Sequence, residues 1–106
     1  MLRPVIHLLL HLVLPATVAR LCFRKIFVRA LLIMLATMAV DLDHLLASPV
    51  YDPGRCSIGF HPLHQYPFIA AYSVLAVIPK TRLLGIGLLI HMFLDGIDCV
   101  WMNYEN

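Results

Sequence analysis

The sequence predicts an all-α integral membrane protein, a single four-helix bundle with both termini on the outer side of the membrane. Of its 106 residues, 61% are hydrophobic and 13% are charged, and the mean hydropathy is +0.87. A soluble domain carries about 25% charged residues, so this chain lacks the polar side chains needed to cover a globule. The net charge of +2 is too small to indicate binding to nucleic acid.

The first predicted helix covers residues 4–23, which are apolar apart from two histidines, a threonine and Arg20 near the end. Twenty such residues are long enough for one membrane span. An apolar stretch that follows Arg3 also fits a signal peptide, but the two histidines and the basic cluster after the stretch argue against cleavage. We expect Pro15 to kink this helix, because proline removes a backbone hydrogen bond.

The other three predicted helices cover residues 26–47, 62–79 and 83–102. The second ends before a Ser-Pro pair, which interrupts the apolar pattern. The third gives about 27 Å of helix if it begins at Pro62 but only about 20 Å if it begins at Pro67, against a bilayer core of about 30 Å. We therefore expect the earlier start.

Basic residues predict the orientation of the bundle. The turns after the first and the third helix hold six of the eight Lys and Arg residues. Two turns separated by an even number of spans lie on the same side, and the positive-inside rule makes that side cytoplasmic. Both termini and the long connection between the second and third helices then face outward.

Histidines and acids converge on the outer side of this topology. All six histidines and five of the six acids fall in the outer half of a helix or in the outer connection. Helical spacing puts the polar residues of the fourth helix within about 60° of one another on one face. The candidate site residues are His7, His11, Asp41, Asp43, His44, His61, His64, His91, Asp95 and Asp98.

A group of imidazoles and carboxylates in apolar surroundings predicts a metal centre. Buried carboxylates must be paired or must bind a cation, and the only basic residues near this end are Arg3 and Arg55. Mixed nitrogen and oxygen ligands suit zinc and also iron or manganese. The set is larger than one zinc ion needs, so it allows either two metal ions or one ion with a second layer of partners.

Four motifs follow one another along nearly the whole chain. They are His7/His11, Asp41-Leu42-Asp43-His44, Gly59-Phe60-His61-Pro62-Leu63-His64 and His91-Met92-Phe93-Leu94-Asp95. Their order resembles that of the bacterial inner-membrane metal-dependent hydrolases of the YdjM type, which carry D-x-D-H, a histidine pair beside glycine, and H-x-x-x-D. More remotely, such families are similar to zinc-dependent phospholipase C and P1-type nucleases, which cleave phosphoesters at a metal cluster between helices.

The resemblance implies a small four-span protein of the bacterial inner membrane with an outward-facing site. It implies metal ligands on all four helices, with His7 or His11 added to Asp41, His44, His61, His64, His91 and Asp95. The family's histidine pair is usually H-x-x-x-x-H with an arginine inside it. Here the pair is two residues closer and encloses Pro62 instead, which makes Arg55 the candidate to replace that arginine.

The leading functional hypothesis is a membrane-embedded hydrolase of a phosphoester or lipid-like substrate at the outer leaflet. Asp43 or Asp98 would act as the general base, with Asp41 as an alternative. Two other classes stay open: a metal-binding or metal-conducting protein without hydrolysis, and a proton-coupled carrier. The cytoplasmic halves of the helices carry no histidine and no acid, which favours an outward-facing site over a conduit. The lipid bilayer is the expected partner, and a homodimer is compatible with four short helices.

Two cysteines lie on the predicted outer side. Cys56 is in the outer connection and Cys99 directly follows Asp98, and both would face an oxidising compartment. A disulfide between them would close a loop of about 40 residues and hold the connection over the site. Two free thiols, or Cys56 as a metal ligand beside His61, are the alternatives.

Overall fold

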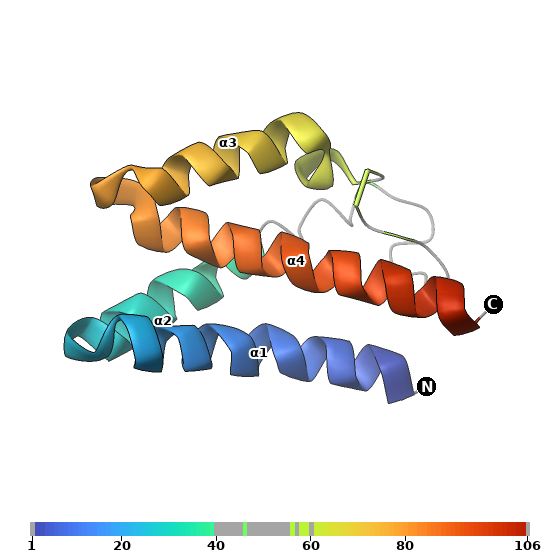
Figure 1. Cartoon of the computed structure of the whole chain (residues 1–106), viewed down its shortest axis with the longest axis horizontal. Helices are drawn as coiled ribbons and strands as arrows, with labels where there is room; N and C mark the ends of the chain where they lie inside the picture. Colours follow the sequence, from blue (N-terminus) through green and yellow to red (C-terminus); the bar gives the residue numbers. More distant parts are fainter. Residues whose placement is uncertain (1, 40–45, 47–55, 57, 60, 106) are drawn as a thin grey trace.

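The structure, a computed structural model, describes residues 2–39, 46, 56, 58–59 and 61–105. Within these ranges the chain has four α-helices and no strand, so the all-α prediction is confirmed (Figure 1). The helices are α1 (Leu2–Cys22), α2 (Phe27–Ala36), α3 (Tyr66–Val77) and α4 (Arg82–Glu105). Short 3-10 turns precede three of them, at Arg24–Ile26, Pro62–His64 and Pro79–Thr81.

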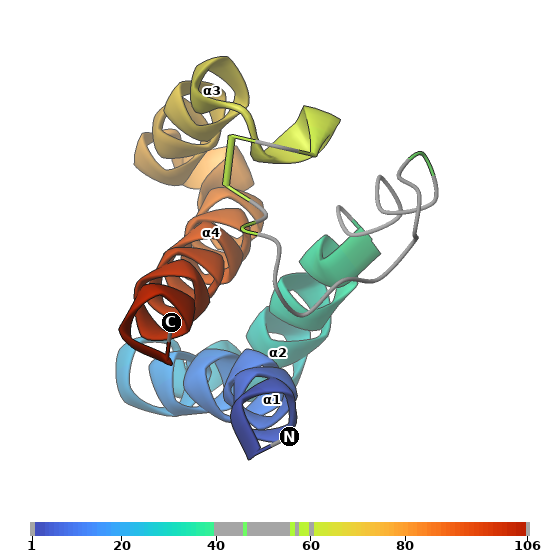
Figure 2. The same ribbon diagram turned by 90° about the vertical axis from the view of Figure 1, so that its right-hand side faces the viewer.

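Helix α4 is the central element. It packs against α1, α2 and α3, and α1 and α2 also pack against each other. Figures 1 and 2 show α3 on one side of α4 and the α1–α2 pair on the other, with both chain ends at the same end of the molecule. Every other helix can therefore bring side chains to α4.

The packed interior consists of two small apolar clusters on either side of α4. Ala19, Ala30 and Met34 form one between α1 and α2, with side chains of α4 against it. Tyr72, Leu88 and Met92 form the other between α3 and α4. Many large apolar side chains lie on the surface and not in these clusters. Helices with apolar residues on every face are typical of a large protein core or of a membrane.

Two helical segments are long and apolar enough to cross a membrane, Val5–Cys22 and Pro79–Tyr104. This finding rests on length and composition alone. A signal sequence or the core helix of a soluble protein can be equally long and apolar. The ten residues of α2 and the twelve of α3 rise only about 15 Å and 18 Å, against a bilayer core of about 30 Å.

The predicted start of the third helix is wrong: α3 begins at Tyr66, not at residue 62. Gln65 is extended, with φ −78° and ψ 154°, and separates the Pro62–His64 turn from α3. The His64 carbonyl accepts a hydrogen bond from the Gly59 N–H at 3.0 Å instead of from the next helical turn. The chain reverses direction at Gly59, which has φ +80°. Glycine adopts this conformation without strain, so it suits this position.

Of the predicted helix 26–47, the structure describes an α-helical part over Phe27–Ala36. Helix α2 ends at Ala36, and residues 37–39 form a 3-10 turn. The Thr37 hydroxyl donates to the Met34 carbonyl, and threonine side chains that bond the backbone in this way compete with helix continuation. Residues 40–45 and 47 lie outside the described part, so the rest of this helix stays a prediction. The bounds of α1 and α4 are within three residues of those predicted.

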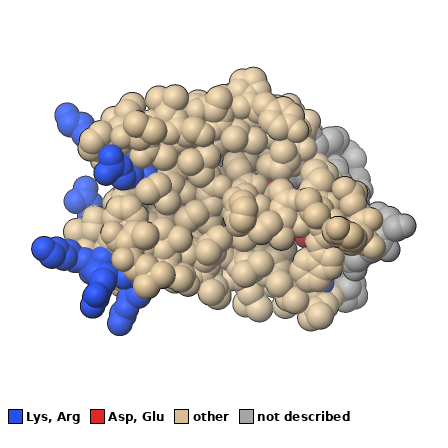
Figure 3. Space-filling model, in the orientation of Figure 1, with Lys and Arg blue, Asp and Glu red and all other residues tan. Residues whose placement is uncertain are grey.

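Basic side chains gather at the end of the molecule opposite the chain termini. Figure 3 shows Lys and Arg over the α1–α2 and α3–α4 turns at its left edge. The residues are Arg20, Arg24, Lys25, Arg29, Lys80 and Arg82. The folded chain thus brings the two basic turns together, as the orientation argument requires.

Helices α3 and α4 come close together at Gly85. We expect any larger residue at this position to destabilise the protein. A Cβ atom at Gly85 would overlap the backbone of Ala76 in α3. Gly85→Ala should lower the free energy of unfolding by about 1–3 kcal/mol, because two packed backbones must separate. Thermal unfolding of the detergent-solubilised protein, followed by circular dichroism, measures the change.

The matched control for this prediction is Gly96→Ala on the same helix. An added Cβ at Gly96 meets nothing within 4 Å, and alanine favours helix over glycine by up to about 1 kcal/mol. This variant should unfold at the parental temperature or slightly above it. Equal behaviour of the two variants would contradict the close-packing role of Gly85.

Candidate metal centre

Five side chains from three elements form one group, which consists of Asp95 and the four histidines around its carboxylate. Two come from α1, one from the Pro62–His64 turn, and two from α4. They are His7, His11, His64, His91 and Asp95. All except His7 are buried, with 5% or less of the residue exposed.

One oxygen of Asp95 faces the two histidines of α1. Its Oδ1 lies 3.0 Å from Nε2 of His7 and 3.5 Å from Nε2 of His11. The two imidazoles are one helical turn apart, so they project from the same face of α1 and their ring centroids are 4.3 Å apart. We call His7, His11 and Asp95 the α1 triad.

The other oxygen of Asp95 faces His64 from the Pro62–His64 turn and His91 from α4 itself. Its Oδ2 lies 2.8 Å from Nε2 of His64 and 3.2 Å from Nε2 of His91, and the two nitrogens are 3.3 Å apart. We call His64, His91 and Asp95 the His64 triad. In each triad the ligand atoms lie within 4.8 Å of one another. Ligands about 2.0–2.1 Å from a tetrahedral zinc ion lie about 3.3 Å apart, so such distances suit a metal ion.

The hydrogen bond of His11 determines which of its ring nitrogens carries the proton. Nδ1 lies 2.8 Å from the backbone carbonyl oxygen of His7, which can only accept, so Nδ1–H is the donor. A neutral His11 therefore presents an unprotonated Nε2 to the Asp95 carboxylate, and this buried nitrogen has no hydrogen bond within the described part of the chain. Metal-ligating histidines have this arrangement, with the other ring N–H donated to a carbonyl or carboxylate.

A simpler interpretation of the same group is a carboxylate that accepts hydrogen bonds from the surrounding histidines, which we call the histidine cradle. A carboxylate offers about four lone-pair sites, and four imidazole N–H groups could fill them. His7, His64 and His91 fit this interpretation. Neutral His11 does not, because its lone pair and the carboxylate oxygen would face each other as two acceptors. A cation between them, either a second proton on His11 or a metal ion, removes the conflict.

Asp98 lies one turn beyond Asp95 and forms an ion pair with Arg3. Nη1 of Arg3 is 2.7 Å from Oδ1 of Asp98, and both residues are largely buried. The same carboxylate oxygen lies 3.9 Å from Nδ1 of His7, so Asp98 borders the α1 triad. Arg3 is one of the two basic residues expected near this end; the predicted role of Asp98 as general base stays a prediction.

His61 is brought to the edge of the site but belongs to neither triad. It is 1% exposed, and its ring centroid is 5.6 Å from that of His64. Its assignment as a ligand therefore stays a prediction. The other predicted site residues, Asp41, Asp43, His44 and Arg55, lie outside the described residues.

A family model described as "Family of unknown function (DUF6122)" matches residues 1–102. The chain belongs to this family. No curated protein and no solved structure matches it. The matched range contains both triads, so all five side chains of the candidate site in this DUF6122 protein lie within the family region.

Two residues that support the histidine turn of the DUF6122 protein were not predicted. Gln65 donates from Nε2 to the Gly59 carbonyl at 2.9 Å, and the Tyr72 hydroxyl donates to the Leu63 carbonyl at 2.8 Å. The turn is thus anchored on both sides of His64. Gln65 adjoins the motif in sequence, which was a usable signal, whereas nothing in the sequence linked Tyr72 to it.

A disulfide joins Cys56 to Cys99, with the two Cα atoms 5.0 Å apart. Of the three interpretations open from the sequence, the structure confirms the bridge. Cys99 lies one helical turn beyond Asp95, and Cys56 lies five residues before His61. In the DUF6122 protein the bridge therefore ties the segment that carries the histidine turn to the helix that carries the shared carboxylate.

Proposed function

We propose that this protein is a membrane-embedded metal-dependent hydrolase that cleaves a phosphoester or lipid-like substrate at the outer leaflet. The observation that carries the metal assignment is the Nε2 lone pair of His11, fixed by its own hydrogen bond and aimed at Asp95. The hydrolase class is supported by the motif order, which resembles that of YdjM-type metal-dependent hydrolases.

The proposed topology has four spans with both termini outside. Two long apolar segments and the basic end of the molecule support it. The α-helical parts of α2 and α3 cross only part of the bilayer, which leaves the Pro62–His64 turn at membrane depth. Irregular backbone is tolerated there when protein groups satisfy it, and Gly59, Gln65 and Tyr72 bond this segment.

The two triads would hold one or two metal ions around the shared Asp95 carboxylate. Nitrogen and carboxylate ligands suit zinc best, with iron or manganese as alternatives. A divalent ion in such a site supplies Lewis-acid chemistry, polarising a phosphoryl oxygen and making water a competent nucleophile near neutral pH.

The chain's own groups account for the remaining tasks of hydrolysis. Asp98 lies outside both triads but borders His7, so it can accept a proton beside the site. Arg3 holds Asp98 in place through their ion pair and keeps its charge compensated in an apolar surround. Asp43 is the second proposed general base.

A metal-binding protein without hydrolysis is the second candidate function. The near-complete burial of His64 and His91 favours it, because a substrate must reach the metal for catalysis. Both candidates require the same triads, so metal content alone does not separate them.

We expect the detergent-purified protein to contain a transition metal and to hydrolyse a phosphoester only while that metal is bound. Elemental analysis measures the metal, and phosphomonoesters, phosphodiesters and phospholipids in mixed micelles serve as substrates. Chelation should abolish turnover and added zinc should restore it. His11→Ala should lose turnover and the metal held by the α1 triad, whereas Ser73→Ala, which removes an exposed hydroxyl on α3, should lose neither.

Two outcomes would contradict the proposal at different levels. Bound metal without hydrolysis of any substrate in the panel would favour the metal-binding protein. Absence of metal from the wild-type protein after purification in metal-supplemented buffer would refute the metal centre and leave the histidine cradle as the interpretation.

A further inference from the structure

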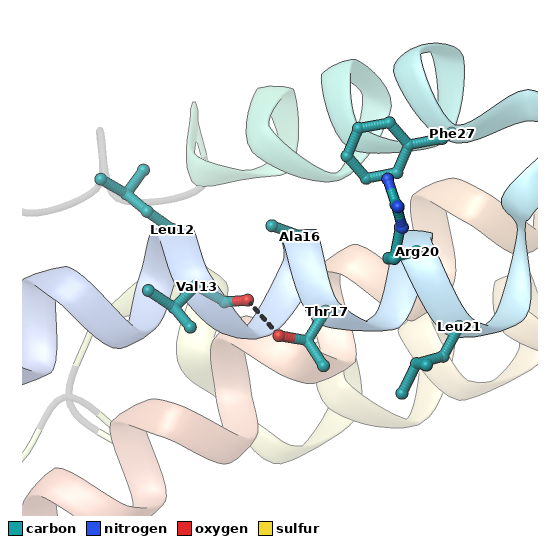
Figure 4. Close-up of a pocket in the computed structure, with 7 residues that line it drawn as sticks. All are labelled: Leu12, Val13, Ala16, Thr17, Arg20, Leu21 and Phe27. Carbon is teal, nitrogen blue, oxygen red and sulfur yellow. Dashed lines mark hydrogen bonds between the residues drawn. The ribbon is translucent and has the colours of Figure 1, made fainter.

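We propose that the groove between α1 and α2 binds one anionic phospholipid, with the lipid phosphate on Arg20 and an acyl chain along the groove. The groove measures about 480 Å³, and Arg20, one of the residues of the basic end, is among those that line it (Figure 4). This inference rests on the membrane location proposed above, but it does not depend on the metal centre.

The floor of the groove is apolar and suits a hydrocarbon chain. Leu12, Val13 and Ala16 line it from α1, and Phe27 lines it from α2. Ala16 leaves space between larger side chains, and Leu12 and Val13 are about half exposed. The Thr17 hydroxyl does not alter this character, because it donates to the Val13 carbonyl at 2.9 Å, as the dashed line in Figure 4 shows.

Arg20 gives the groove a cationic end. Its guanidinium carbon lies 5.9 Å from the centroid of the Phe27 ring, a cation–π contact that orients the charge beside the groove. Residues 12 to 20 span about 12 Å along the helix, so the apolar floor extends over about this length and ends at the Arg20 cation. An occupant that matches both parts has an anionic head and an apolar tail.

Charge complementarity strengthens the case for an anionic head. Three further basic residues, Arg24, Lys25 and Arg29, lie within nine positions after Arg20, and residues 1–40 contain no Asp or Glu. No acid on α1 or α2 can therefore neutralise this cluster. In the proposed topology this end meets the cytoplasmic leaflet, where basic residues near the surface attract anionic lipids.

The test compares lipids that differ only in their head. Purified protein is loaded with dioleoyl phosphatidylglycerol or dioleoyl phosphatidylcholine, and native mass spectrometry counts the lipid retained. We expect one tightly held phosphatidylglycerol and weaker retention of phosphatidylcholine. Arg20→Gln should weaken phosphatidylglycerol retention about fivefold, the effect of one basic side chain near an anionic lipid. Ala16→Leu, which fills the groove without a change in charge, should weaken retention of both lipids.

Lys80→Gln is the matched control, because Lys80 is an exposed cation at the same end but does not line the groove. It should retain phosphatidylglycerol as the wild type does. Metal content should be unchanged in Arg20→Gln, which separates this result from any failure of the metal centre. The proposal is overturned if both lipids are held equally, if Lys80→Gln matches Arg20→Gln, or if soluble glycerol phosphate competes as well as the lipid.

Discussion

Replacing Asp95 with asparagine is expected to remove metal binding from both sides of the site at once. Asp95 is the residue common to the α1 triad and the His64 triad, and each of its oxygens faces two imidazole nitrogens. Asparagine keeps the shape of the side chain but loses the negative charge. We expect at least a hundredfold loss of affinity, more than the 10–100-fold that loss of an outer-layer partner costs. A calorimetric titration of the protein with the metal measures this affinity.

Single histidine variants show whether the site holds one ion or two. With two ions, His7→Ala should weaken only the ion on the Oδ1 side, and His64→Ala only the ion on the Oδ2 side. Ser73→Ala is the control, because it removes an exposed hydroxyl on α3 that belongs to neither triad. Wild-type metal affinity in Asp95→Asn would mean that the four histidines bind no metal through this carboxylate.

Breaking the Cys56–Cys99 bridge is expected to cost up to about 4 kcal/mol of stability. That value follows from the chain-entropy model for a sequence separation of 43. Cys99→Ser should lower the unfolding temperature and also weaken metal binding at the His64 triad, because the bridge ties the histidine-bearing segment to α4. Thermal unfolding and metal titration, each with and without a reductant, measure the two effects.

Cys22→Ser is the control for the disulfide prediction. Cys22 is an exposed free thiol on α1, so its loss should change neither quantity. Mass spectrometry of the unreduced, alkylated wild-type protein should find Cys22 modified and the other two cysteines protected. Alkylation of both Cys56 and Cys99 before reduction would show that the bridge is absent from the protein in solution.

Local patterns predicted the long helices better than the short ones. The apolar sequences of α1 and α4 are long, and the ends of these helices were predicted to within three residues. The start of α3 was misplaced because it depends on a hydrogen bond from Gly59 to His64, formed by a chain reversal. The periodicity of apolar residues contains no information about such a bond.

Half of the candidate site also follows from local spacing. His7 and His11 share a face of α1, and His91 and Asp95 share a face of α4, because residues one turn apart project in the same direction. Their meeting across the two helices is a tertiary result. So is the contribution of His64, whose buried position depends on anchors at Gln65 and Tyr72.

The sequence by itself determined the all-α class, the two long apolar segments and the clustering of basic residues in two turns. Composition and spacing decide these features, because they depend on neighbouring residues and on solvent. Only the tertiary structure decided that Asp95 is shared between two pairs of histidines and that Arg3 pairs with Asp98, 95 residues away. Such contacts require helices packed at a definite distance and rotation. Glycines such as Gly85, where α4 lies against the backbone of α3, determine that distance.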